Sequence, residues 1–312
     1  MGPRNEGMQR SLAGVGGVAR SSACVAPAVF SREAACRMRR RGACLLSGIA
    51  LAVLATTSGI MSITAAAPSS FDAIVVFGDS LSDAGNAGRA SNGPVWVEQL
   101  ASLLSVTLKP ARVGGTNYAV GGAHLNPRSG PYNLRAQADV YLNQARPKGR
   151  ILHIVYGGGN DLLAAAQDRA ALALVDAAIA SLRSIVADLV AKRGGDILVP
   201  TLPDVGLTPA IRSRGSEAAA EARKLSEHFN RGIDRVLAEP AGAAIRIHRL
   251  DVWGMAERTR ADPSASGFKN ITQPCAHLRT CEGYLFWDNV HPTTAAHRRL
   301  AEAALAVLTQ IK

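Results

Sequence analysis

Continuous apolar runs that end at glycine or proline are the clearest pattern along the chain. Residues 73–77 end at Gly78, residues 151–156 end at three glycines, and residues 196–200 end at Thr201-Leu202-Pro203. Runs of this length without polar alternation are typical of strands buried on both faces of a parallel sheet. The pattern predicts three such strands, each opening into a loop at its C-terminal end.

Segments rich in Ala, Leu, Arg and Glu lie between these runs and predict helices. A strand at residues 244–250 completes the alternation, and the last predicted helix has Pro292 at its first position. Strands that alternate with long helices predict one domain built on a doubly wound parallel sheet with helices on both faces. The predicted helices span residues 94–104, about 168–192, about 216–237 and 292–311.

The N-terminal part has the order of a secretory leader. Basic residues 38–41 precede the apolar residues 43–61, and small residues follow at 64–68. This order predicts a signal peptide that is removed near Ala66 or Ala67, with export to the periplasm or the medium. A retained membrane anchor is the alternative, because the apolar run is almost long enough to span a bilayer. We therefore assign residues 1–67 to an N-terminal extension and leader, and residues 68–312 to the folded domain.

The net charge of +11 does not indicate a nucleic-acid partner. Residues 1–66 carry eight of the Arg and two of the Glu residues, so the remainder of the chain has a net charge of +5. This value is ordinary for a soluble domain, and no basic run with interleaved aromatic residues follows the leader. The sequence predicts no nucleic-acid binding and indicates no oligomeric state.

Two cysteines, Cys275 and Cys281, remain after the leader. An even pair six positions apart in an exported chain predicts a local disulfide. Half of a metal site is the alternative, but no second Cys or His pair has the spacing of zinc ligands, so we predict no metal.

Polar residues directly after the predicted strands are the candidates for chemistry, because ligands of such sheets bind at the carboxyl ends of the strands. Ser80 follows the first strand in Gly78-Asp79-Ser80, which taken alone is an ordinary turn. Near the C-terminus, Asp288 and His291 lie three positions apart in a loop. A carboxylate that accepts Nδ1–H from an imidazole leaves Nε2 free to take a proton from a serine.

Two glycine-rich stretches can supply donors for an oxyanion. Gly122 can present a backbone N–H that no side chain obstructs, and Asn160 can present a side-chain amide. For neighbouring polar residues, backbone contacts are the simpler interpretation: Asp79 and Asp83 in turns, Ser82 as a local cap, and Asp161 as a structural partner in its loop.

Four blocks in order resemble the GDSL or SGNH hydrolases. They are the segment from Phe77 to Asn86, the segment from Asn117 to Ala123, Gly158-Gly159-Asn160-Asp161, and the segment from Tyr284 to Thr293. The resemblance covers roughly residues 71–312. Two further stretches, residues 92–98 and 202–209, are similar to the branch that holds plant GDSL lipases and bacterial secreted esterases.

The resemblance implies a three-layer, flavodoxin-like doubly wound sheet of about five strands and no cofactor or metal. It implies Ser80 as nucleophile, with Asp288 and His291 completing a triad. The oxyanion hole would consist of Gly122, Asn160 and the Ser80 backbone N–H. The implied function is a secreted esterase or lipase that acts on acyl esters through an acyl-enzyme, in transient contact with a lipid surface where the substrate is a lipid.

Other functions remain open at this point. A lysophospholipase, an acyltransferase or a carbohydrate deacetylase would use the same triad, and a non-catalytic binding protein can share the fold. A nucleotide or flavin binder is disfavoured because no Gly-x-Gly-x-x-Gly run opens a helix. Trp96, Tyr132 and Trp287 either line an acyl pocket or serve as packing.

Overall fold

The computed structural model describes residues 71–130, 132–239, 241–242 and 245–310. The predicted leader and the anchor alternative, which concern residues 1–67, lie outside the described residues. Within the described residues, no helix is both long and apolar enough to cross a membrane.

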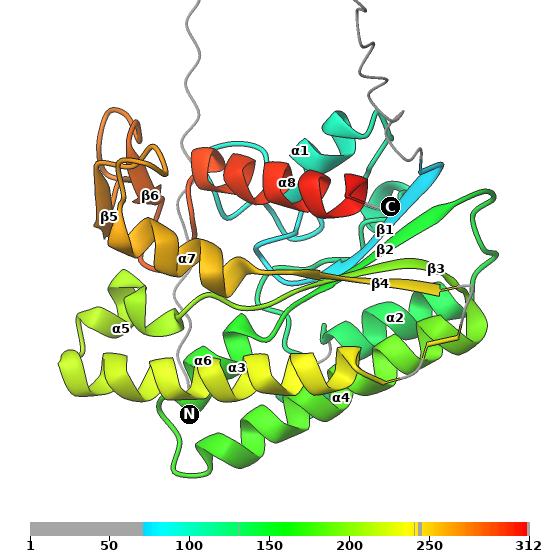
Figure 1. Cartoon of the computed structure of the whole chain (residues 1–312), viewed down its shortest axis with the longest axis horizontal. Helices are drawn as coiled ribbons and strands as arrows, with labels where there is room; N and C mark the ends of the chain where they lie inside the picture. The colour runs from blue at the N-terminus through cyan, green and yellow to red at the C-terminus, as the bar shows by residue number, and fades with distance from the viewer. Residues whose placement is uncertain (1–70, 131, 240, 243–244, 311–312) are drawn as a thin grey trace, which may run out of the picture. The chain divides into compact units, whose positions relative to one another are not determined.

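A parallel sheet forms the centre of the described domain (Figure 1). Its order is β1-β2-β3-β4, and every neighbouring pair is parallel, in register from Ala73 opposite Ile151 to Gly78 opposite Tyr156 in the first pair. The three predicted apolar runs are buried, whereas the fourth strand is partly exposed at the edge of the sheet. The strands are β1 Ala73–Gly78, β2 Ile151–Tyr156, β3 Gly195–Pro200 and β4 Ile245–Leu250.

Residues 116–120 take the fifth position of the sheet, beside β1. The Tyr118 N–H donates to the Val76 carbonyl over 2.8 Å, and the Val120 N–H donates to the Gly78 carbonyl over 3.1 Å. Among the described residues, a single isolated parallel bridge, between Val76 and Asn117, joins this segment to β1, and a second joins Asn117 to Pro110. The expected sheet of about five strands is thus four full strands and one short paired segment.

Helices cover both faces of the sheet, as the alternation predicts. In Figure 1, α1 and α8 lie on one side, and α2, α3, α4 and α6 lie on the other. Their buried positions, such as Val175, Ile179 and Leu182 of α4, join the strands in one core. The bounds are α1 Trp96–Leu103, α2 Leu134–Leu142, α3 Gly159–Ala165, α4 Ala171–Lys192, α6 Ser216–Leu237 and α8 Thr294–Thr309.

The start of the last helix differs from the prediction. The helix begins at Thr294, not at Pro292, because the Thr293 hydroxyl caps it by accepting the Ala296 N–H. Pro292 lies before the cap, and its carbonyl accepts the Ser91 hydroxyl at 2.9 Å.

A second unit of structure follows β4 that the sequence pattern did not predict. Residues 262–273 have a polar, loop-like sequence, but residues 270–273 belong to strand β5, which pairs in parallel with β6. The elements outside the main sheet are α5 Pro209–Arg212, α7 Val252–Ala261, β5 Asn270–Pro274, β6 Tyr284–Phe286 and the short 3-10 turns Ala111–Val113, Pro127–Ser129 and Val205–Leu207.

The two cysteines of this region are bonded. Cys275 at the end of β5 and Cys281 before β6 form a disulfide. The predicted pairing is therefore present, and it closes the connection between the two strands.

Candidate active site

Ser80 lies half-buried at the carboxyl end of β1, in the turn that the apolar run predicts. The preceding Gly78 is required there, because a Cβ would lie 2.8 Å from the Tyr156 carbonyl oxygen of the neighbouring strand. Asp79 is buried and accepts the Leu81 N–H at 3.0 Å, while its own carbonyl accepts the Ser82 N–H at 3.0 Å. These bonds fix the turn that presents the Ser80 hydroxyl.

Two hydrogen bonds connect Asp288, His291 and Ser80. His291 Nε2 lies 2.8 Å from Ser80 Oγ, and His291 Nδ1 lies 2.8 Å from Asp288 Oδ2. The other carboxylate oxygen of Asp288 accepts the backbone N–H groups of Val290 and His291 at 2.8 and 2.6 Å. The fold thus brings Ser80 next to a pair of side chains more than 200 positions away in sequence. The Asp288 carboxylate binds both the ring and the backbone of His291.

Burial opposes ionisation of Asp288, but its hydrogen bonds with His291 and Val290 outweigh that effect. They hold the pKa of the carboxyl below its usual value. A carboxylate ionised at neutral pH accepts Nδ1–H, which leaves Nε2 as the acceptor toward the serine hydroxyl. The arrangement suits a histidine that removes a proton from Ser80.

The Gly122 backbone N–H and the Asn160 side-chain amide, both predicted as oxyanion donors, lie on adjoining segments. Gly122 has φ +78°, a conformation that favours glycine, and a Cβ there would meet open space. Asn160 lies in the first turn of α3, and its Nδ2 donates to the Ala123 carbonyl at 2.8 Å. That bond uses one of the two amide hydrogens, so the second remains to donate to a substrate oxygen.

Asp161 binds the backbone of residues 125–126, just after the glycine-rich loop that contains Gly122. Its two buried carboxylate oxygens accept the Leu125 and Asn126 N–H groups at 2.8 and 2.9 Å. His124 Nδ1 lies 3.6 Å from Asp161, and the nearby carboxylate raises the pKa of this imidazole. The interpretation of Asp161 as a structural partner in its loop is correct, whereas the sequence did not indicate its pairing with His124.

Asp83 likewise binds backbone, as predicted. It accepts the N–H groups of Gly85, Asn86, Ala87 and Gly121 at 2.6 to 2.9 Å. The bond to Gly121 links the turn that carries Ser80 to the loop that carries Gly122.

Ser82 differs from its predicted role as a local cap. Its buried hydroxyl accepts the indole N–H of Trp96 at 3.0 Å, and the indole packs edge-on against Tyr156. Trp96 is fully buried and serves as packing, so the alternative of a pocket-lining residue does not hold for it.

The carboxyl of Asp79, the residue before Ser80, is buried. Burial raises the pKa of this carboxyl to about 6, and the charge of Asp161 adds to the effect. A group that titrates near neutral pH this close to the site contributes to the pH dependence of stability.

A cavity of about 490 Å³ opens on Ser80, Asn160 and His291. Its wall contains the loop after β3, helix α7, and parts of β5, β6 and α8. None of Trp96, Tyr132 and Trp287 lines it. The sequence pattern did not predict α7, β5 or β6. Helix α7 has one buried residue, β5 is largely polar, and β6 has three residues, so none of them forms a clear periodic pattern.

The described residues contain no group of three or more His, Cys, Asp or Glu side chains that could hold a metal ion. Two histidines outside the Ser80 site pair with carboxylates that are distant in sequence. His228 lies 2.7 Å from Asp176, and His248 lies 2.8 Å from Asp196. None of these four residues lines the cavity beside Ser80, so the two pairs are not part of the site.

Comparison with known proteins identifies the family of the chain. The GDSL-like Lipase/Acylhydrolase family matches residues 74–304. Phosphatidylcholine-sterol acyltransferase of Aeromonas hydrophila is 29% identical, over 86% of this chain and 96% of that protein. Lipase 1 of Photorhabdus luminescens is 33% identical over 177 residues, which are 51% of this chain and 27% of the lipase. The match thus spans only about a quarter of the lipase.

A solved structure of a lipolytic G-D-S-L family protein from Veillonella parvula has 18% identity and a TM-score of 0.49. It covers 77% of this chain and 99% of that one. The family match includes β1 with the turn that carries Ser80, as well as the loop of Asp288 and His291. The chain therefore belongs to the GDSL-like lipase/acylhydrolase family.

Proposed function

We propose that this protein is a serine-dependent carboxylic ester hydrolase with Ser80 as nucleophile and Asp288 and His291 as its activating pair. The observation that carries the proposal is the unbroken series of hydrogen bonds from Asp288 through His291 to the Ser80 hydroxyl, at the mouth of a largely apolar cavity. Family membership supports the same chemistry.

The reaction proceeds in two halves. His291 Nε2 takes the Ser80 proton while Ser80 Oγ bonds to the ester carbonyl carbon, and the carbonyl oxygen takes up the negative charge. The C–O bond to the alcohol then breaks, and the alcohol oxygen receives the proton from His291. Water attacks the resulting acyl-serine with His291 again as base, which releases the carboxylic acid and restores Ser80.

The developing oxyanion needs donors that are already in position. Asn160 Nδ2, the Gly122 N–H and the Ser80 N–H are the proposed donors, and each such donor is worth about 10²–10³ in turnover. The bonds from Asn160 to Ala123 and from Leu125 and Asn126 to Asp161 support this assignment, because they hold the loop and α3 in one arrangement.

Acyl transfer to an alcohol is the second candidate activity. It is favoured by the likeness to an acyltransferase that extends over most of both chains. The acyl-serine is common to both reactions, so only the acceptor in the second half differs. Lysophospholipids and acetylated sugars are substrates for the same proposed machinery.

We also propose that the protein is exported. The order of basic, apolar and small residues over 38–68 supports a leader. The disulfide between Cys275 and Cys281 supports an oxidising compartment.

The test compares wild type with Ser80→Ala in hydrolysis of p-nitrophenyl esters and in covalent labelling by a fluorophosphonate probe. Ser184→Ala is the matched control, because this hydroxyl lies on α4 away from the cavity lining, where it donates to the Ser181 carbonyl and accepts from Arg135. We expect Ser80→Ala to lose both signals while Ser184→Ala keeps them. Wild-type turnover or labelling in folded Ser80→Ala would contradict the proposal. Added glycerol separates the two activities, since an acyltransferase forms the glycerol ester faster than the free acid.

A further inference from the structure

The cavity beside Ser80 has one wall that the proposed chemistry does not explain. Leu202, Val205 and Leu207, from the loop after β3, line it together with Met255 and Ala256 of α7. This loop is part of the stretch 202–209, which is similar to one branch of the family and has no role in the proposed chemistry. The remaining lining is also largely apolar, with Leu163, Phe268, Ile271 and Leu285 among its members.

We infer that the cavity binds the acyl chain of the ester, and that a network of ion pairs among Asp204, Arg223 and Glu257 determines how long a chain it accepts. The inference rests on the proposed function, because it assigns the occupant of a cavity that opens on the proposed nucleophile. The substrate class it names is esters of medium- to long-chain fatty acids.

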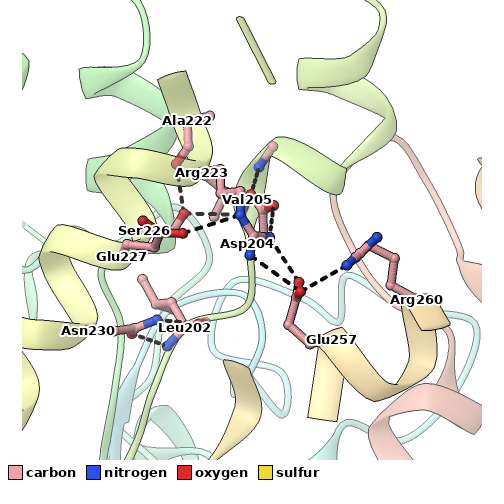
Figure 2. Close-up of polar contacts among 11 residues, drawn as sticks. Leu202, Asp204, Val205, Ala222, Arg223, Ser226, Glu227, Asn230, Glu257 and Arg260 are labelled. Atoms are coloured by element: carbon pink, nitrogen blue, oxygen red, sulfur yellow. Dashed lines mark hydrogen bonds and ion pairs between the residues drawn. The ribbon is translucent and has the colours of Figure 1, made fainter. Parts of the chain in front are cut away.

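Arg223 joins the two segments of this wall (Figure 2). Its Nη1 lies 3.0 Å from Asp204 Oδ2 on the loop and 2.9 Å from Glu257 Oε1 on α7, and its Nη2 lies 3.3 Å from Glu257 Oε2. The guanidinium also lies 4.7 Å from the centre of the Trp253 ring of α7. One side chain of α6 thus holds the loop and α7 at a fixed separation.

The loop is bound to α6 at two more points along the same helix face. Ser226 Oγ accepts the Val205 N–H at 3.2 Å. The Asn230 side chain exchanges two hydrogen bonds with the backbone of Leu202, each of 2.8 Å. Arg223, Ser226 and Asn230 have the spacing of one helix face, so α6 is a rigid support for the loop (Figure 2).

By contrast, α7 depends on the ion pairs for its attachment to α6. Only Val252 is buried among the residues of α7. Asp204 is nearly inaccessible, with 4% of its side chain exposed, and Arg223 is its ion-pair partner, so removal of Arg223 leaves a buried charge without compensation. Glu257 also accepts Arg260, a cavity-lining residue of the next turn, at 3.2 Å. We expect loss of Arg223 to release α7 and to loosen this wall.

A loosened wall affects only the part of the substrate that lies in the cavity, which is the acyl chain. A methylene group that becomes buried contributes about fourfold to binding or to kcat/KM. Acetyl esters have almost no chain to bury, whereas dodecanoyl esters depend on contact with Met255, Ala256 and the loop. Arg223 is therefore a positioning residue whose loss reduces turnover more strongly as the chain lengthens.

The experiment measures kcat/KM for p-nitrophenyl esters from acetate to dodecanoate in wild type, Arg223→Ala and Arg223→Lys. Lys224→Ala is the matched control, because Lys224 is the next residue of α6 and pairs only with exposed Glu221. We expect Arg223→Ala to lose at most about threefold on acetate and at least thirtyfold on dodecanoate. Arg223→Lys should recover part of that loss, and Lys224→Ala should match wild type at every length.

Two further variants keep the inference testable if Arg223→Ala does not fold. Glu257→Gln weakens the attachment of α7 alone and should give a smaller loss of the same kind. Ala256→Trp fills the cavity and should reduce turnover of dodecanoate while acetate turnover changes little. Equal loss at all chain lengths, in Arg223→Ala or in Ala256→Trp, would overturn the inference. Failure of the fluorophosphonate probe to label Ser80 in folded wild-type protein would instead refute the proposed function.

Discussion

His291 Nε2 lies 2.8 Å from Ser80 Oγ although 211 positions separate the two residues. β1 ends at the turn of Ser80, and the Thr293 cap starts α8 two residues after His291. Both residues are thus held by the ends of regular elements, which gives the pair a defined geometry before substrate binds.

Asp288→Asn tests the role of the carboxylate. An amide cannot favour the Nδ1–H tautomer in the same way, so we expect kcat to fall about 10³–10⁴-fold with little change in KM. Steady-state kinetics on a short p-nitrophenyl ester is the measurement. Asp139→Asn, which changes an exposed carboxylate paired with Arg135, should retain full activity.

Asn160→Ala tests the oxyanion donor. Loss of the amide should lower kcat about 10²–10³-fold, because the donor matters most when charge develops on the carbonyl oxygen. The exposed Asn143→Ala on α2 is the control. A drop confined to KM would show that Asn160 binds substrate in the ground state instead.

Asp79→Asn tests the raised pKa of the buried carboxyl. Since the folded pKa is about 6 against 3.8 for the unfolded chain, ionisation of Asp79 costs no stability at low pH, and the cost grows as pH rises from about 4 to 6. The variant should therefore be more stable than wild type. Its free energy of unfolding should be roughly 3 kcal/mol higher at pH 8 and less than about 1 kcal/mol higher at pH 4. Urea denaturation at the two pH values measures this, and an equal difference at both would exclude the assignment.

Replacing both Cys275 and Cys281 with serine tests the disulfide of the β5–β6 unit. The disulfide lowers the entropy of the unfolded chain, which for so short a loop stabilises the folded state by about 2 kcal/mol. The free energy of unfolding of the variant should therefore be lower than that of wild type by this amount. Denaturant midpoints of the wild type with and without a reductant give an independent value. Unchanged midpoints in both comparisons would mean that the bond contributes nothing to stability.

The main sheet was predictable because its strands are buried on both faces and therefore form apolar runs. The turns that end them were predictable for the same reason, which located Ser80 and Asn160. Strand β5 was not, because residues 262–273 are polar and the pairing with β6 is short and irregular. The role of Arg223 was also beyond the sequence, since its partners Asp204 and Glu257 are 19 and 34 positions away and ion pairs at such separations leave no local pattern.

The distance in sequence between Ser80 and His291 has a consequence for synthesis. A growing chain that ends before residue 288 contains the serine, the glycine-rich loop and all four strands of the main sheet, yet lacks the base and its carboxylate. Under the proposed mechanism, a translation intermediate has no group to activate Ser80 until residues 288–291 have been added. The order of these residues along the chain thus places the activating pair last, after the whole main sheet has been synthesised.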